Sequence, residues 1–408
     1  MTLEERTIPV HDLTVGMYVS RLDRDWEGTP FPLQGVLIRS QQDIDALSRY
    51  CREVVVDITL GLAPPERNSL LTLEERHPRG ERVEGLQQRV VYENRSSFED
   101  EVPNAREARE TAGTLAHQVL DDVQEGRRLD AAQVRRAVEP IVQSVLRNMD
   151  AWFWIESLRK RDLEAYHHAL NCSALAAAFG RHMGFPEPLL LDLATGGLLL
   201  DIGKLRLPPD LFAKPGPLDA NETALVRTHV ELGLAIIQDA DPRAPMVHAM
   251  LRTHHERHDG SGYPAALPEP LIPLVGRMAG VVDSYCAMTG ARAYRPAFSQ
   301  HVALQELYRL RYKLYGAEVV EQFLQCLGVY PTGSLVELSD GCVAIVMAQN
   351  VARRLFPKVM VLTGPDKHLA GAFQPLDLLH HQAEGGQLWI SRPLPPGAYD
   401  LDPTELYL

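Results

Sequence analysis

Three histidines and two carboxylates fall within residues 254–259, and a glycine-tyrosine-proline turn follows at 262–264. Adjacent histidines are uncommon in a packed core because each buried imidazole needs polar partners. Gly260 and Gly262 permit tight turns, and Pro264 biases the preceding residue toward an extended backbone. Taken alone, the stretch also fits a solvent-facing polar loop. Histidines and aspartates elsewhere in the chain favour a ligand-binding site instead.

Further candidate ligands stand on segments with helical periodicity. Glu164 and His168 are four residues apart, which places both side chains on one face of a helix. His229 precedes another apolar helix, and Asp283 comes late in an apolar run. A carboxylate in such a run is costly to bury unless it is paired or bound to a metal. These residues are therefore expected to face a common interior site.

Asp201 follows the apolar run 198–200 and opens the sequence Asp-Ile-Gly-Lys. A helix end closed by Gly203 is expected here, because glycine is the usual residue after a helix C-terminus. This arrangement would place Asp201 and Lys204 beside whatever the helix faces.

Together, four histidines and three carboxylates occupy inward positions, with no cysteine among them. Oxygen and imidazole ligands suit Fe or Mn better than a structural zinc bound by thiolates. Seven ligands are too many for one ion, so two or more divalent metals sharing a carboxylate are expected. Such a centre activates water and clamps an in-line displacement at phosphorus. The candidate ligands are Glu164, His168, Asp201, His229, His254, His255 and Asp283.

Nearby cations and one aromatic residue supply the groups that a phosphate-bearing nucleotide would need. Lys204, Arg292 and Arg295 are placed to hold phosphate oxygens. Tyr263 is placed to stack on a base. The alternatives are a solvated charged face for the cations and a packed turn for the tyrosine.

Composition bounds the functional classes. The 408 residues are 45% hydrophobic and 23% charged, as in an ordinary soluble protein. The net charge of −13 argues against binding of a nucleic-acid polymer. No apolar run of about 18 residues predicts a membrane span, and the acidic N-terminus does not resemble a signal peptide. Five scattered cysteines predict reduced core thiols in a cytoplasmic protein.

The hydrophobic periodicity predicts a multidomain α+β protein. Residues 1–62 are expected to form a small β-rich domain with one helix at 40–50, and 63–99 a linker. Residues 100–330 are expected to form an all-α domain, with helices at 105–123, 131–149, 151–161, 162–183 and 186–199. A small β-rich segment, with strands at 333–338, 343–346 and 358–362, is expected within 331–408.

From about residue 151 to 338 the chain resembles HD-GYP domain proteins, the bacterial cyclic di-GMP phosphodiesterases. The resemblance is carried by linked motifs, and residues 13–19 also resemble the uncharacterised domain that often precedes this module. The motifs are Asp-Ile-Gly-Lys at 201–204 with Pro208 and Lys-Pro-Gly at 214–216, the block at 254–264, the segment 283–296, and Gly-Val-Tyr-Pro at 328–331.

The resemblance implies metal ligation by the seven candidate ligands, with Lys204 over the attacked phosphate. It implies that Tyr263, Arg292 and Arg295 bind the dinucleotide. The family hydrolyses cyclic di-GMP to linear pGpG, and some members continue to GMP. The Gly262–Pro264 surface implies contact with GGDEF-domain proteins, and a homodimer is a further expectation.

One residue departs from the family pattern. The name-giving histidine before Asp201 is Leu200 here, and leucine cannot bind a metal. Weaker metal affinity and reduced activity are therefore expected. The alternative is a catalytically inactive cyclic di-GMP receptor or scaffold that signals through partners. A third interpretation is an HD-type hydrolase acting on another nucleotide.

Overall fold

The computed structural model describes residues 5–24, 35–57, 89–159, 164–214, 216–290, 297–350, 353–383, 386–402 and 404. The chain forms two compact units, one of Met1–Gly85 with Val351–Arg354 and the other of Leu86–Asn350 with Leu355–Leu408. Among the described residues, every helix is too short or too polar to cross a membrane.

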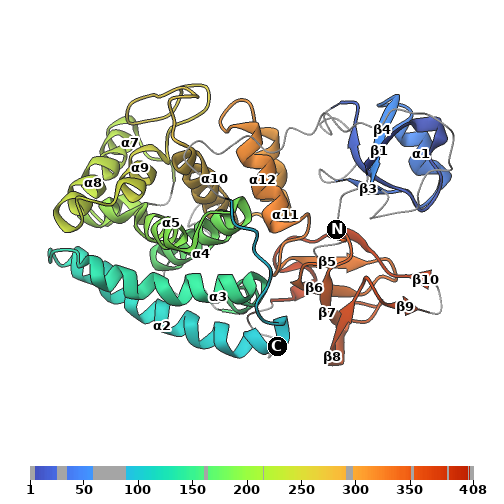
Figure 1. The fold of residues 1–408 in the computed structure, drawn as a ribbon. Helices are drawn as coiled ribbons and strands as arrows, with labels where there is room; N and C mark the ends of the chain where they lie inside the picture. Colours follow the sequence, from blue (N-terminus) through green and yellow to red (C-terminus); the bar gives the residue numbers. More distant parts are fainter. Residues whose placement is uncertain are drawn as a thin grey trace. The chain divides into compact units, whose positions relative to one another are not determined.

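The first unit contains an antiparallel sheet and one helix (Figure 1). The sheet order is β1-β4-β2-β3, with bounds Glu5–Pro9, Glu53–Asp57, Tyr18–Leu22 and Val36–Leu37. Helix α1, Gln41–Leu47, begins after Ser40, whose backbone N–H donates to the Asp43 carboxylate at 3.0 Å. Ile44 and Leu47 are buried on its inner face. The expected β-rich segment with a helix after Ser40 is confirmed.

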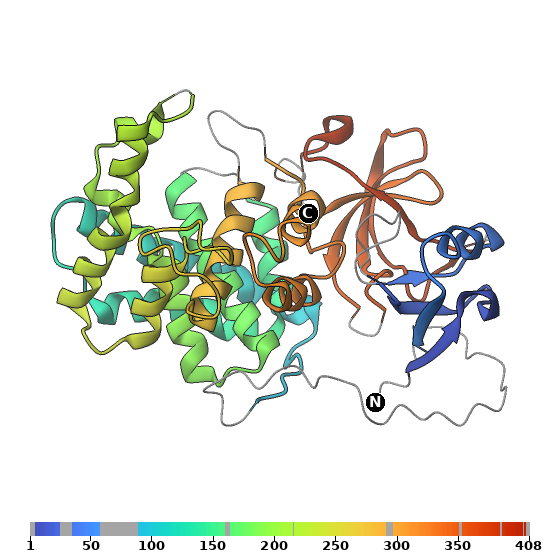
Figure 2. The ribbon, with the colours of Figure 1, turned by 90° about the horizontal axis from the view of Figure 1, so that it is seen from above.

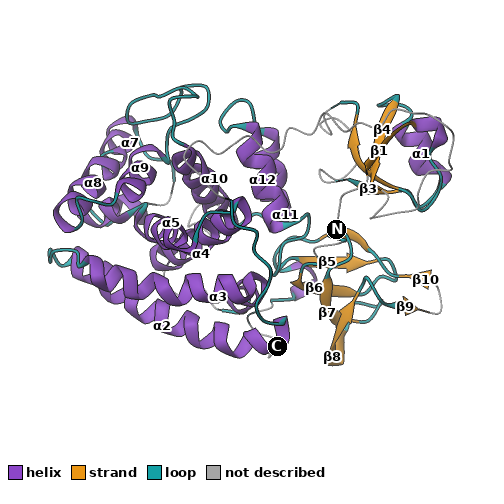
Figure 3. Ribbon diagram, viewed as in Figure 1, coloured by secondary structure: helices purple, strands orange, loops and turns teal. Residues whose placement is uncertain are grey.

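The second unit is mainly helical over its first two thirds (Figure 3). The helices are α2 (Phe98–Gln124), α3 (Ala131–Ser157), α4 (Glu164–Met183), α5 (Glu187–Leu199), η2 (Ile202–Arg206), α6 (Asp210–Ala213), α7 (Ala220–Arg227), α8 (His229–Ala240), α9 (Pro245–Thr253), α10 (Leu274–Thr289), α11 (Gln300–Arg309) and α12 (Ala317–Leu327). The periodic segments of the sequence correspond to α2, α3, α4 and α5. The two helices expected at 131–149 and 151–161 correspond to α3, which non-helical backbone at Asn148 divides close to the predicted break.

An antiparallel sheet of order β11-β5-β6-β7-β8 completes this unit. The bounds are Ile390–Pro393, Leu335–Leu338, Val343–Ala348, Lys358–Thr363 and Leu369–Asp377, with a separate β9–β10 pair at Gln382–Ala383 and Gly386–Gln387. Figure 1 and Figure 2 both place this sheet beside the helices. Phe98 and Trp154 pack with Leu335 and Ile345 in one apolar cluster. The predicted α+β class and its three C-terminal strands are confirmed.

A buried ion-pair network joins the first three helices of this unit. The Arg109 guanidinium of α2 donates to the Glu156 carboxylate of α3, and His167 Nδ1 of α4 lies 3.0 Å from Glu156 Oε1. Burial alone would raise the pKa of Glu156, but His167 and Arg109 outweigh it and lower the pKa from 4.5 to about 2. The network therefore fixes α4, which carries His168, against α2 and α3.

Glu156→Gln is expected to lower the free energy of unfolding at pH 7 by about 3 kcal/mol, because it leaves Arg109 buried without its counter-charge. The depressed pKa means that this stabilisation is present above pH 4.5 and is lost as the pH falls toward 2. Urea unfolding of both proteins across this range measures the difference. The exposed Glu110→Gln is the control. A difference that does not shrink at low pH would contradict this assignment.

Candidate metal centre

The candidate ligands are carried by α4, by the junction of α5 with η2, by α8 and α9, and by α10. Helix α5 buries apolar residues on most of its surface and ends at Leu199, and Leu200 continues with helical dihedrals. Asp201 follows directly, before η2 begins. It therefore emerges from a buried helix end into the interior of the unit.

Gly203 does not close α5, so that expectation is wrong. It lies inside η2, where an added Cβ would stand 1.9 Å from the His229 carbonyl oxygen. Only glycine permits this approach between η2 and the start of α8. The close packing places Asp201 Oδ1 3.4 Å from His229 Nε2.

The first group of donors consists of Asp201, His229, His254 and His255, whose ligand atoms lie within 4.8 Å of one another. His229 Nδ1 faces the Val226 carbonyl oxygen at 2.7 Å. His254 Nδ1 likewise faces a carbonyl oxygen, at 2.8 Å. A carbonyl accepts only from a protonated Nδ1, so Nε2 of each ring carries the lone pair. Such backbone bonds commonly fix imidazoles that bind metals.

Four buried polar atoms of this first group have no hydrogen-bond partner among the described residues: Asp201 Oδ1 and Nε2 of His229, His254 and His255. An unsatisfied buried polar atom costs about 1–3 kcal/mol, so four converging ones need an explanation. Burial lowers the pKa of His229 to about 4 and that of His255 to about 2. Both rings are therefore neutral at pH 7. Neutral imidazoles with inward lone pairs fit a divalent cation.

The second group consists of His168, Cys172 and Asp283. His168 Nε2 lies 3.1 Å from Asp283 Oδ1 and 3.4 Å from Cys172 Sγ. The other oxygen of Asp201, Oδ2, lies 3.6 Å from the same nitrogen. Asp201 therefore presents one oxygen to each group, as a bridging carboxylate does.

The pKa shifts of the second group indicate that positive charge is stabilised there. Burial alone would lower the pKa of His168, but the Cys172 sulfur and the Asp283 carboxylate raise it well above its ordinary value. Burial raises the pKa of Asp201, yet the Lys204 ammonium and the neighbouring histidines hold it well below its usual range. Protons and Lys204 thus supply the charge that a bound cation would supply.

The remaining predicted residues are placed as follows. Lys204 Nζ donates to Asp201 Oδ2 at 2.6 Å. The Tyr263 ring stacks on His255 at 4.5 Å between centroids, and the Arg227 guanidinium carbon lies 4.8 Å from the Tyr263 centroid. The Glu164 side chain, Arg292 and Arg295 lie outside the described residues.

Two residues at the site were not singled out from the sequence. Arg227 carries no signal beyond its position two residues before His229. Cys172 was assigned to the core with the other cysteines, although its spacing of four from His168 places both on one face of α4. That spacing was the available signal.

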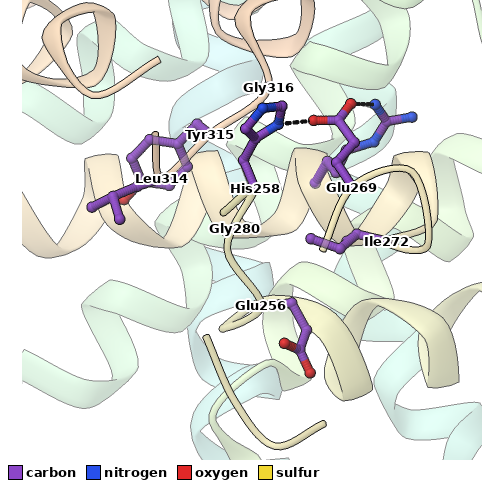
Figure 4. A pocket seen from close by; sticks show the side chains of 9 residues that line it. Glu256, His258, Glu269, Ile272, Gly280, Leu314, Tyr315 and Gly316 are labelled. Carbon is purple, nitrogen blue, oxygen red and sulfur yellow. Dashed lines mark hydrogen bonds and ion pairs between the residues drawn. The ribbon is translucent and has the colours of Figure 1, made fainter. Parts of the chain in front are cut away.

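The histidine-rich stretch divides into two parts with different roles. His254 and His255 face the donor cluster, whereas Glu256 accepts from the backbone N–H groups of Ala265 and Leu267 at 2.8 and 2.9 Å. Figure 4 shows His258 and Glu269 pointing toward each other in a small pocket, and Arg277 pairs with the same carboxylate. The second half of the stretch thus holds the loop after α9, but with Glu256 buried it is not the solvent-facing polar loop of the alternative interpretation.

Comparisons with known proteins agree with this geometry. Residues 148–319 match the family described as HD domain, and residues 5–134 match a domain of unknown function, DUF3391. A cyclic di-GMP phosphodiesterase of Pseudomonas aeruginosa is 31% identical over 361 residues, covering 87% of this chain and 84% of that protein.

Two further relatives match over shorter stretches. A cyclic di-GMP phosphodiesterase of Thermotoga maritima is 35% identical over 166 residues, which are 40% of this chain and 45% of that protein. A 3'3'-cGAMP-specific phosphodiesterase of Vibrio cholerae is 33% identical over 158 residues, which are 38% of this chain and 30% of that protein.

Asp201→Asn is expected to remove most of the bound metal, because both donor groups share this carboxylate. Manganese retained per chain after dialysis, and the rise in melting temperature on adding Mn²⁺, measure the loss. His248→Asn is the matched control, since its ring on α9 faces the Asp241 carbonyl oxygen instead. If Asp201→Asn retains metal like the unaltered protein, the bridging assignment is wrong.

Proposed function

The chain belongs to the HD-GYP family of HD-domain phosphodiesterases, and we propose that it hydrolyses cyclic di-GMP to linear pGpG in a metal-dependent reaction. The observation that carries the proposal is the Asp201 carboxylate, which faces one donor group with each oxygen. Two ions held on such a carboxylate match the requirements of displacement at a phosphodiester. The names of the relatives support the choice of substrate.

The donor set supports two divalent ions. His229, His254 and His255 would hold one, His168 and Asp283 the other, with Asp201 shared and Glu164 as a further ligand. When bound, the ions supply Lewis acidity that activates water and neutralises phosphoryl charge. Iron or manganese is proposed from the oxygen and imidazole donors.

The chain's own residues orient and hold the substrate. The backbone carbonyls of Val226 and Leu251 fix two imidazoles, so the ligands need no reorganisation when an ion enters. Lys204 is about one third exposed and is held at the edge of the centre by Asp201. This position allows its ammonium to neutralise charge on the attacked phosphate.

Recognition of the dinucleotide is assigned to residues around Tyr263. Its ring orientation is fixed by His255, and the exposed Arg227 lies over the ring, so an arginine and an aromatic surface adjoin the centre. Arg292 and Arg295 are proposed to bind the phosphates with it. Three properties remain predictions. They are binding of GGDEF-domain proteins at residues 262–264, formation of a homodimer, and a cytoplasmic location.

The domain boundaries are also a proposal. We assign residues 1–62 to an N-terminal domain, 63–99 to a linker, 100–330 to the catalytic helical domain and 331–408 to a C-terminal β segment. Limited proteolysis with mass spectrometry of the fragments tests these boundaries.

Anaerobically purified protein, loaded with iron or manganese, is expected to convert cyclic di-GMP to pGpG. Liquid chromatography of the reaction mixture measures the pGpG formed. Lys204→Met is expected to lower the rate about 100- to 1,000-fold through loss of charge stabilisation. Lys358→Met, on β7, is the control. Metal and nucleotide bound without product would refute the enzyme and support a receptor. Faster hydrolysis of 3'3'-cGAMP would reassign the substrate.

Leu200→His tests the departure from the family pattern. Leu200 is 2% exposed and precedes Asp201 directly. A histidine there is expected to raise metal affinity about tenfold or more and to increase hydrolysis. A metal titration monitored by mass spectrometry measures the change in affinity, and the pGpG assay measures the change in hydrolysis. Unchanged metal content would show that residue 200 does not adjoin an ion.

A further inference from the structure

We propose that Cys172 is a metal ligand, whose sulfur supplies the donor that Leu200 cannot. The inference rests on the proposed two-ion centre and assigns the ligands of its second ion. It gives that ion a mixed set of one sulfur, one nitrogen and two carboxylate oxygens. The residue types in the sequence predict a centre without cysteine, and Cys172 would correct that prediction.

The distances around His168 carry the inference. Nε2 of His168 lies 3.4 Å from Cys172 Sγ, 3.1 Å from Asp283 Oδ1 and 3.6 Å from Asp201 Oδ2. Two atoms that bind one ion at bond lengths of about 2.0–2.3 Å lie roughly 3.3–3.8 Å apart in a tetrahedral site. The separations to Cys172 and Asp201 fall in that range, and the separation to Asp283 is slightly shorter. The ligand atoms of His168, Cys172 and Asp283 also lie within 4.8 Å of one another, close enough to share one ion.

The helices fix this arrangement before any ion enters. His168 and Cys172 are one turn apart on the same face of α4, which packs against α10. Helix α10 contributes Asp283. Cys172 is fully buried, whereas the His168 and Asp201 side chains are 18% and 20% exposed. An ion would enter from the histidine side and meet the sulfur at the inner wall.

Leu200 takes one donor away from the centre, and the Cys172 sulfur would add one. Leu200 directly precedes Asp201 and offers no donor, which leaves His168, Asp283 and one oxygen of Asp201 as the described ligands besides Cys172. Cysteine brings the described ligands to four, and Glu164 remains a further proposed ligand of the centre. On binding, the thiol proton leaves to solvent and a metal–sulfur bond forms. A thiolate favours iron, cobalt or zinc over manganese and magnesium at this position.

Cys286 provides a matched control within the same core. It lies three residues after Asp283 on α10 and is a hydrogen-bonding neighbour of Cys172. It is nevertheless absent from the clusters of converging donor atoms among the described residues. Substituting Cys286 therefore perturbs the same packing without removing the proposed ligand.

The test is the absorption spectrum of metal-free protein loaded anaerobically with Co²⁺. The unaltered protein and Cys286→Ala are expected to show a near-ultraviolet sulfur-to-cobalt charge-transfer band. Cys172→Ser is expected to lose the band and to bind about one cobalt fewer per chain. Visible cobalt bands from the His229 group should persist in Cys172→Ser, which shows that the variant is folded.

A second variant keeps the inference testable if Cys172→Ser unfolds. Leu200→His with Cys172→Ala is expected to regain the lost cobalt without the sulfur band. The inference is overturned if the charge-transfer band survives in Cys172→Ala. It is also overturned if the unaltered protein binds cobalt without showing the band. Either outcome leaves the phosphodiesterase proposal standing. Failure to bind any cobalt overturns both.

Discussion

The structure depends on one desolvated carboxylate, Asp201, which is held charged in the interior. Burial disfavours its charge, and the Lys204 ammonium with the surrounding imidazoles compensates. Each oxygen of Asp201 faces a different donor group, so five elements must meet around a single residue. The helix ends, the glycine of η2 and the loop after α9 are arranged to satisfy that requirement. A buried charge is stable only while this shell stays complete.

The shell is built by two kinds of constraint. At His229 and His254, a backbone carbonyl three residues earlier fixes the imidazole. Between segments, close packing sets the distances, as at Gly203, where an added Cβ would stand 1.9 Å from the His229 carbonyl oxygen. The Arg109–Glu156–His167 network adds a third anchor beside His168. Local hydrogen bonds thus aim the ligands, and tertiary packing brings them together.

Much of this was predictable from the sequence because it follows from periodicity and spacing. The helices α2 to α5 and the three C-terminal strands were anticipated, and the histidine and aspartate ligands were predicted as one set without the division into two groups. The role of Gly203 was not, because a contact between residues 26 positions apart leaves no local pattern. The loop-holding role of Glu256 and His258 was missed for the same reason. The break near Asn148, by contrast, was predicted within two residues, between 149 and 151. Cys172 was missed for a different reason. Its spacing of four residues from His168 was visible in the sequence, but its residue type indicated a core residue.

The carbonyl-fixed imidazoles have a consequence for how the centre comes apart. Because the His229 and His254 rings are each fixed by a carbonyl of their own turn, partial loosening of the helix packing separates these ligands without rotating them. Their separations then grow together as the helices part. The ions should consequently be lost in a single cooperative event that coincides with loosening of the helical core, rather than by stepwise dissociation of single ligands. In this protein, metal retention would serve as a reporter of native packing.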